Sequence, residues 1–408
     1  MHPAPKTLWK TFTAAPHRMM MLGGAIQGVL TILWWLFDLL GRYSDLYVAP
    51  VWSIAPLWAH AFLMLYGFFP FFIFGFLMTT YPNWMNGEKI PQRHYIPSFL
   101  LMTCGMALFY LGLVAGKVFL VMGVLLLLAG WGIALYSLTG VMVRASYPDK
   151  RHPIITTLAL GMGWLGILSY LIWLVSESPV ALEFSRQAGI WWFMLPILLA
   201  VSHKMIPFFS SRVLDNYTMV RPYWALYCML ACSILHGALE LTQQPKLLWL
   251  IDFPLLACAL YFSITWGLLR SFKIRLLAVL HVGFAWFSIA MLLYGVQSLM
   301  LFATGSAPFG LAALHTLTIG FFASMILAMA SRVTLGHSGR ELLADGPTWA
   351  LFLSFQLVAV VRIIPDVLGF PGSVFYPLAA VIWLASYGIW FAKYGPIYWR
   401  PRIDGRDG

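Results

Sequence analysis

Acidic side chains are scarce in this sequence, and charged side chains of either sign are few. Asp and Glu together number 14 in 408 residues, and the four charged residue types make up 10% of the chain, whereas hydrophobic residues make up 61%. The mean hydropathy is +0.82. A soluble protein of this size cannot bury so much apolar surface, so the composition excludes that class and indicates an integral membrane protein. The net charge of +11 then reflects basic cytoplasmic loops rather than nucleic-acid binding.

Cysteine is also scarce, and the motifs of several enzyme classes are missing. No phosphate-binding loop, CxxC, HExxH or GxSxG motif occurs. The sequence therefore assigns no catalytic residue and leaves open whether the protein is an enzyme. Cys228 and Cys232 share a helix face with His236. The favoured interpretation is that they are small buried hydrophobic side chains, and a soft-metal site is the alternative. All four lie within apolar stretches, where no extracytoplasmic disulfide is expected: Cys104, Cys228, Cys232 and Cys258.

Twelve apolar stretches approach the length of about 20 residues that a bilayer-crossing helix needs. They predict an all-α fold, a polytopic bundle of about twelve transmembrane helices in a single transmembrane domain over residues 1–408. The tails are expected at 1–18 and 394–408, and the first stretch lacks a small-residue cleavage site, so it is interpreted as an uncleaved anchor. The expected spans are 19–40, 57–80, 96–115, 118–143, 154–176, 187–208, 222–242, 247–270, 276–301, 308–331, 348–369 and 373–393.

The distribution of Lys and Arg predicts the orientation. If the N-terminus is cytoplasmic, twenty of the 25 basic residues fall in inner segments. Cytoplasmic loops are enriched in Lys and Arg, so both termini are expected inside a bacterial cytoplasmic membrane. The outer segments hold only five: Arg42, Lys117, Arg186, Lys246 and Arg362.

Histidines within or beside the apolar stretches indicate metal or redox chemistry, because an ionisable side chain is costly in hydrocarbon and is usually functional there. For each one, a hydrogen bond to a backbone carbonyl is the alternative. His60 and His315 open their helices from the outer side, so we expect them to be axial ligands of one b-type haem. The other metal-ligand candidates are His236, in the outer half of its helix, and an inner set for which copper is suitable: His203, His281 and His337.

A small, polar and basic segment follows the helix that contains His315. It runs from Ser331 to Arg340 and includes His337. An ordinary cytoplasmic loop is one interpretation. The other is that Arg332 or Arg340 pairs with a haem propionate or another anion.

Two segments resemble the NnrS family. They are LHTLTIGFFASMILAMASRVTLGHSGREL, from Leu314 to Leu342, and WAHAFLMLYGF, from Trp58 to Phe68. The shorter blocks LHVGFAWF and IPFFSSRV are similar to it in the same order. The resemblance covers nearly the whole chain and implies a cell inner-membrane protein that contains haem and copper. It also implies a role in the nitric oxide response and in nitrosative stress, with the bilayer, a small gaseous ligand such as NO and an electron donor of unknown identity as partners.

The chain departs from the family pattern at one motif, which usually reads like WHAHE. His60 matches its first histidine, but Phe62 and Leu63 stand where the second histidine and the acid would be. The order of histidines is also distantly reminiscent of haem–copper oxidase catalytic subunits, although their adjacent histidine pair on helix 7 is absent. A twelve-helix small-molecule or metal transporter is the alternative function, and a cofactor-free membrane scaffold or sensor is a third.

Overall fold

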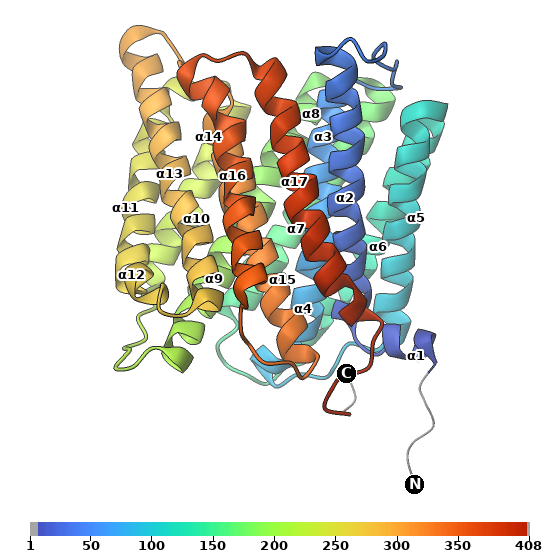
Figure 1. Cartoon of the computed structure of the whole chain (residues 1–408), viewed down its shortest axis with the longest axis vertical. Coiled ribbons are helices and arrows are strands. Elements are labelled where there is room, and N and C mark those ends of the chain that lie inside the picture. The colour runs from blue at the N-terminus through green and yellow to red at the C-terminus, as the bar shows by residue number, and fades with distance from the viewer. Residues whose placement is uncertain (1–6, 406–408) are drawn as a thin grey trace.

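The computed structural model describes residues 7–405, and within that range the chain is helical and contains no strand. The helices form one upright bundle (Figure 1). The short helix α1 (Leu8–Phe12) and the turn η5 (Gly395–Tyr398) lie at the same end, which we call the basal end; we call the opposite end apical. Lys6, Arg406 and the outermost parts of the predicted tails lie outside the described residues. The predicted all-α polytopic bundle is confirmed.

Among residues 7–405, eleven helical stretches are long and apolar enough to cross a membrane. Three of them change helix type along their length: α3 (Pro56–Phe62) continues through η1 (Leu63–Phe68) into α4 (Phe69–Met85), α8 (Pro179–Gln187) through η2 (Ala188–Met194) into α9 (Leu195–Val213), and α14 (Ala312–His315) through η4 (Thr316–Ala323) into α15 (Ser324–His337). The others are α2 (Pro16–Tyr43), α5 (Gln92–Ala115), α6 (Lys117–Arg144), α7 (Arg151–Ser176), α10 (Tyr223–Leu241), α13 (Arg275–Thr304), α16 (Gly346–Leu368) and α17 (Gly372–Tyr394).

The predicted span 247–270 forms a shorter element than expected. It gives α11 (Trp249–Thr265), preceded by the turn η3 (Pro245–Leu247) and followed by α12 (Leu268–Ser271). The break lies at Gly267, whose φ of 85° is left-handed and ends a helix readily. The 17 residues of α11 rise roughly 25 Å at 1.5 Å per residue, and the helix runs beside α13 (Figure 1).

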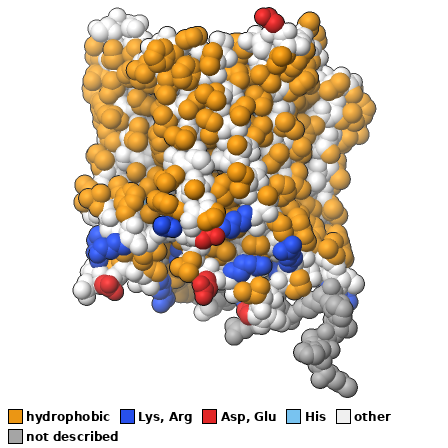
Figure 2. Space-filling model, in the orientation of Figure 1, with side chains coloured by type: hydrophobic (Ala, Val, Ile, Leu, Met, Phe, Trp, Pro, Cys, Tyr) orange, Lys and Arg blue, Asp and Glu red, His pale blue; other side chains and the backbone are white. Residues whose placement is uncertain are grey.

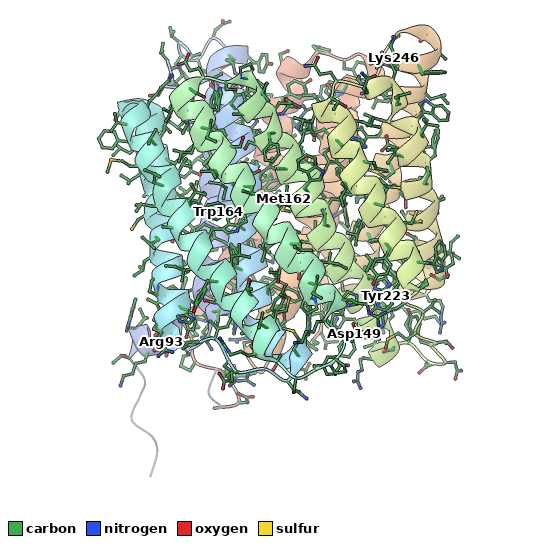
Figure 3. All side chains as sticks on the ribbon, turned by 180° about the vertical axis from the view of Figure 1, so that it is seen from behind. Arg93, Asp149, Met162, Trp164, Tyr223 and Lys246 are labelled. Carbon is green, nitrogen blue, oxygen red and sulfur yellow. The ribbon has the colours of Figure 1, made fainter. Side chains whose placement is uncertain are left out.

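The side walls of the bundle are apolar, as a membrane protein requires. Leucine, valine and isoleucine side chains such as Leu158, Val175 and Ile264 are more than half exposed. Hydrophobic side chains cover the wall in Figure 2, while Lys and Arg gather toward the basal end. Figure 3 shows the bundle from behind, with Arg93 at the basal end and Lys246, one of the five basic residues assigned to outer segments, at the apical end. The wall is the surface that contacts lipid.

The first and last long helices close the bundle on each other. Trp383 of α17 donates from its indole nitrogen to the carbonyl oxygen of Gly28 in α2 over 3.0 Å, and the Tyr387 hydroxyl donates to the carbonyl oxygen of Gly24 over 3.2 Å. Glycine exposes these carbonyls because no side chain covers them. The contact brings α17 against α2 beside the start of α3, where His60 lies.

Candidate functional site

A cavity with a volume of about 370 Å³ opens within the apical half of the bundle, and both His60 and His315 line it. We call it the apical cavity. Its volume falls in the range of about 300–1,000 Å³ that is usual for ligand and cofactor sites. Its wall is mostly apolar and aromatic, with contributions from Trp35, Trp58, Met64, Phe69, Ile319 and Trp383.

His60 lies about one turn into α3 and carries a buried nitrogen with no partner. Its ring stacks on the Trp35 ring, with the centroids 4.2 Å apart and the planes 16° from parallel. The stack covers one face of the ring. Nδ1 is buried and makes no hydrogen bond to any described residue. Because a buried polar atom without a partner costs free energy, this imidazole is arranged as a site that takes a further partner.

His315 is held in one tautomer by its own helix. Its Nδ1 lies 3.0 Å from the carbonyl oxygen of Leu311. A carbonyl only accepts, so Nδ1 carries the proton and donates it. The lone pair of the neutral ring therefore stays on Nε2. Metal-ligating histidines usually have this arrangement, in which a carbonyl or carboxylate orients the ring from behind.

Two arginines line the apical cavity beside the histidines. Arg362 of α16 donates to Asp366 over 2.8 Å and lies 4.0 Å over the Tyr376 ring. Arg186 of α8 donates to Glu183 over 2.7 Å and also lines the cavity. The sequence indicated these arginines only as two of the five outer basic residues. The position of Arg362 within an expected span was a signal that it faces the interior of the bundle, whereas Arg186 lies just before the span expected at 187–208 and gave no such signal.

Three π-helical segments follow cavity-lining residues, and no sequence pattern predicted them. The segment η1 begins three residues after His60, η2 begins two residues after Arg186, and η4 begins directly after His315. A π-helix has a wider turn than an α-helix and is frequent at functional sites. The described helices thus depart from α geometry next to the same cavity.

The three histidines of the predicted inner set, His203, His281 and His337, each contact a different partner. His203 of α9 pairs with His152 of α7, with Nδ1 and Nε2 2.9 Å apart. His281 of α13 lies 3.1 Å from the hydroxyl of Ser210, seven residues along α9 from His203, or roughly 10 Å of helix rise. The ring centroid of His337 lies 4.7 Å from that of His17. Metal binding by His203, His281 and His337 stays a prediction.

Asp149 and Tyr223 lie at the basal end (Figure 3), and the ring of Tyr223 packs beside the His152–His203 pair. Arg151 donates to Asp149 over 2.9 Å, and the Tyr223 hydroxyl donates to the same carboxylate over 3.1 Å. The guanidinium of Arg151 holds the pKa of the Asp149 carboxyl well below its usual range. The ion pair lies at the start of α7, next to His152, and the ring of Tyr223 lies 5.5 and 5.2 Å from the ring centroids of His152 and His203.

Arg332 and Arg340 are at the basal end and do not line the apical cavity. The Arg332 guanidinium lies 3.8 Å over the Phe209 ring. Its Nε and the Nη1 of Arg340 are buried and make no hydrogen bond to a described residue. Binding of an anion by these groups stays a prediction, for a site separate from the cavity of His60 and His315.

The position that departs from the WHAHE pattern is apolar in the structure as well. Phe62 is buried, and its ring stacks on those of Phe109 and Tyr170, with centroids 4.7 and 4.1 Å away. Leu63 is fully buried. Neither residue lines the apical cavity.

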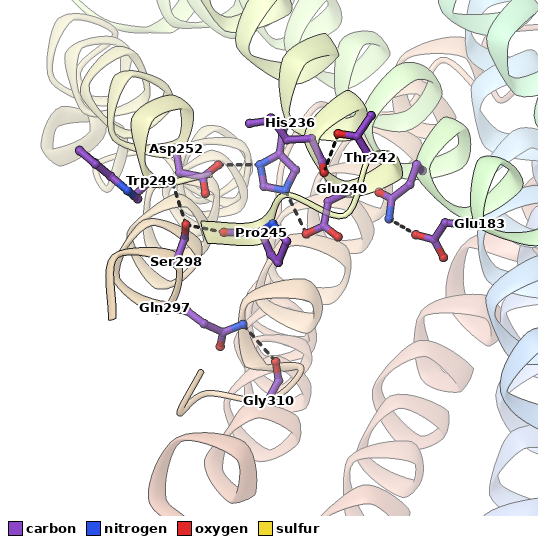
Figure 4. Close-up of polar contacts among 12 residues, drawn as sticks. Glu183, His236, Glu240, Thr242, Pro245, Trp249, Asp252, Gln297, Ser298 and Gly310 are labelled. Atoms are coloured by element: carbon purple, nitrogen blue, oxygen red, sulfur yellow. Dashed lines mark hydrogen bonds and ion pairs between the residues drawn. The ribbon is translucent and has the colours of Figure 1, made fainter. Parts of the chain in front are cut away.

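Side chains that could ligate a metal ion form no larger cluster among the described residues. Within residues 7–405, no three or more His, Cys, Asp and Glu side chains form a cluster suited to a metal ion. The four cysteines are free thiols. His236 forms a hydrogen bond with Asp252 (Figure 4), and its role as a metal ligand stays a prediction.

Comparison with known proteins identifies a family for this chain. The sequence model of the family described as NnrS protein matches residues 11–402. No curated protein matches the chain significantly. The family match spans every element that lines the apical cavity.

Proposed function

The chain belongs to the NnrS family, and on that premise we propose that it binds haem in the apical cavity and protects the cell against nitric oxide. Membership in the family makes it a membrane protein related to the nitric oxide response. The observation that supports the haem proposal most directly is that two histidines from separate helices line one apolar cavity together with two arginines. Haem supplies a redox-active iron that binds small gaseous ligands such as NO.

The donor set fits a haem. His60 and His315 would hold the iron, since His60 has a buried nitrogen without a partner and the free lone pair of His315 is on Nε2. Arg186 and Arg362 would pair with the propionates, because a guanidinium offers a carboxylate two parallel hydrogen bonds. Trp35 orients the His60 ring, and the Leu311 carbonyl fixes the tautomer of His315. The wall around them is mostly apolar, which suits the macrocycle of a haem.

An absorption spectrum of the purified full-length protein tests this proposal. We expect a Soret band and, after reduction, the sharp α and β bands of a six-coordinate b-type haem. Addition of NO to the reduced protein is expected to shift these bands. A protein that stays colourless after expression with excess haem would contradict the proposal.

We also propose that copper binds the basal histidines, as the family resemblance implies. Neutral imidazoles are suitable copper ligands. Because His203, His281 and His337 each contact a different partner in the structure, a copper ion held by all three would require their helix ends to move together on binding. A His281→Ala variant is expected to lose copper and keep its haem, measured by metal analysis and absorption of the same sample. His94→Ala, at the basal start of α5, is the matched control. Unchanged copper in His281→Ala would show that this residue is not a ligand.

The basal end is proposed to be cytoplasmic, with the protein in the bacterial inner membrane. Each of the five basic residues assigned to outer segments belongs to an apical loop or the apical part of a helix. A reporter fused after Asp404 is therefore expected to be active only if it works in the cytoplasm. Fusions in the apical loop between α2 and α3, at Asp45, are expected to show the opposite activity. A periplasmic result at Asp404 would reverse the orientation.

A further inference from the structure

A buried arginine lies at the basal end, where the start of α2 meets residues 398–404, which we call the C-terminal segment. Arg18 is in the first turn of α2 and is only 3% exposed. Its Nη1 donates to the carbonyl oxygen of Arg400 over 2.8 Å and to that of Tyr398 over 3.2 Å. These bonds hold the C-terminal segment against α2, but they supply no negative charge, because a backbone carbonyl is neutral.

The other edge of the Arg18 guanidinium has no partner. Nε is buried and makes no hydrogen bond to a described residue. Within residues 7–405, both side-chain hydrogen bonds of Arg18 come from Nη1, and the guanidinium forms no ion pair. Nε and Nη2 make up the edge with which a guanidinium gives two parallel hydrogen bonds to an oxyanion. Because a buried cation without a counter-ion is costly, this edge is arranged to take an anion.

The turn that carries Arg340 packs on the same C-terminal segment. It follows α15, and its Ser338 carbonyl oxygen accepts from the amide of Ile403 over 3.2 Å. A Cβ atom built at Gly339 would lie 2.8 Å from Cγ of Asp404. The turn and the C-terminal segment are therefore in close contact, on a segment whose other carbonyls hold the start of α2.

Arg340 places a second positive charge within electrostatic reach of Arg18. Its Nη1 is buried and has no hydrogen-bond partner among the described residues. The carboxylate beside this turn belongs to Asp404, and Arg402 already donates to it from Nε and Nη2 over 2.8 and 2.5 Å. Glu341, next in the sequence, is exposed. Two guanidinium groups thus lack a counter-ion in the part of the chain that the structure describes.

Arg332 does not belong to this group, although the sequence suggested it as an alternative to Arg340. Its guanidinium lies over the ring of Phe209 in α9, and it is not within electrostatic reach of Arg18. The structure therefore separates the two arginines of the segment after His315. Arg340 is combined instead with Arg18, which is far away in the sequence and was only one of the twenty inner basic residues.

We propose that Arg18 and Arg340 form a basal site that binds one phosphate group. The phosphate oxygens accept hydrogen bonds from the Nε–Nη2 edge of Arg18 and from Nη1 of Arg340. The group is supplied either by the headgroup of an anionic lipid, since basic pockets between membrane helices bind such headgroups, or by a soluble phosphate. Once bound, it connects the start of α2 with the turn after α15. The proposal is independent of haem in the apical cavity.

Binding of two probes to the delipidated full-length protein in a neutral detergent tests the proposal. The probes are inorganic phosphate and a short-chain phosphatidylglycerol, and the measurement is isothermal titration calorimetry. We expect the wild type to bind one equivalent of at least one probe. Arg340→Gln is expected to weaken that binding about tenfold or more, because a hydrogen bond between charged groups is lost. Since the Arg340 side chain makes no hydrogen bond to a described residue, this variant leaves the contacts of the C-terminal segment in place.

Arg18→Gln is expected to weaken binding at least as much, whereas Arg18→Lys keeps the charge without the two-pronged edge and should retain part of it. The matched control is Arg93→Gln. Arg93 is exposed at the same end of the bundle (Figure 3), so its loss should leave the affinity within about twofold of the wild type, as expected for an exposed charge. Phosphatidylcholine of the same chain length, whose headgroup has no net charge, is expected to bind more weakly than phosphatidylglycerol.

The two probes also distinguish the sources of the phosphate. Binding of phosphatidylglycerol alone would support the site with a lipid headgroup as its ligand. Binding of inorganic phosphate, in competition with the lipid, would support it with a soluble anion. The proposal is wrong if neither probe binds the wild type, or if Arg340→Gln binds both as tightly as the wild type does. Equal weakening by Arg93→Gln would also overturn it, because diffuse surface charge would then account for the binding.

Discussion

A His60→Ala variant and a His315→Ala variant are each expected to lose the six-coordinate haem spectrum of the wild type. Each substitution removes one of the two imidazoles that line the apical cavity. Iron with a single axial histidine becomes five-coordinate and high-spin, or the haem is lost during purification. Nearly all of the haem should lose the six-coordinate spectrum, because the ligand is deleted rather than moved. The measurement is the absorption spectrum of reduced protein, normalised to protein concentration.

A rescue experiment separates ligand loss from misfolding. Alanine leaves a space of the size of the imidazole, so added free imidazole is expected to restore the six-coordinate bands in both variants. Size-exclusion profiles should match the wild type. The control is His94→Ala, at the basal end of α5, which should keep the wild-type spectrum. If both cavity variants keep that spectrum, the haem lies elsewhere, and the basal histidines become the first place to search.

Most of the helix boundaries could be predicted from the sequence. The span expected at 118–143 is α6, Lys117–Arg144, and the span expected at 348–369 is α16, Gly346–Leu368. These boundaries are local, since a charged residue or a Pro–Gly pair interrupts a long apolar run. The early end of α11 was missed because Trp266 and Gly267 continue the apolar run, whereas the left-handed backbone at Gly267 is what ends the helix.

Only part of the candidate site could be predicted from the sequence. Depth in the membrane was enough to bring His60 and His315 together as a hypothesis, because both open helices from the same side. The partners of the basal histidines were not predictable. His152 and His203 are 51 residues apart and meet only because α7 packs beside α9. The two cavity arginines and the three π-helical segments likewise depend on how distant helices pack.

Replacing Gly123 by leucine is expected to prevent normal folding of the α5–α6 hairpin. A Cβ atom built at Gly123 would lie 2.6 Å from the carbonyl oxygen of Gly105, and one built at Gly105 would lie 2.6 Å from the carbonyl oxygen of Gly123. Both obstacles are backbone atoms, so no side chain can move aside. Small residues at such crossings allow two membrane helices to approach closely. Overpacking a close contact costs about 1–3 kcal/mol, and more where the backbone must shift.

The measurement is the yield of monodisperse protein after detergent extraction, together with its thermal unfolding temperature. Gly123→Leu should lower both strongly, and Gly123→Ala should lower them less. Gly161→Leu in α7 is the matched control, because no heavy atom lies within 4 Å of a Cβ built there, so its extra side chain extends into free space. Equal behaviour of the Gly123 and Gly161 leucine variants would mean that α5 and α6 do not cross this closely. Because α6 packs on α7, and α7 contacts α9 through His152 and His203, a misplaced α6 in Gly123→Leu is also expected to disturb this histidine pair.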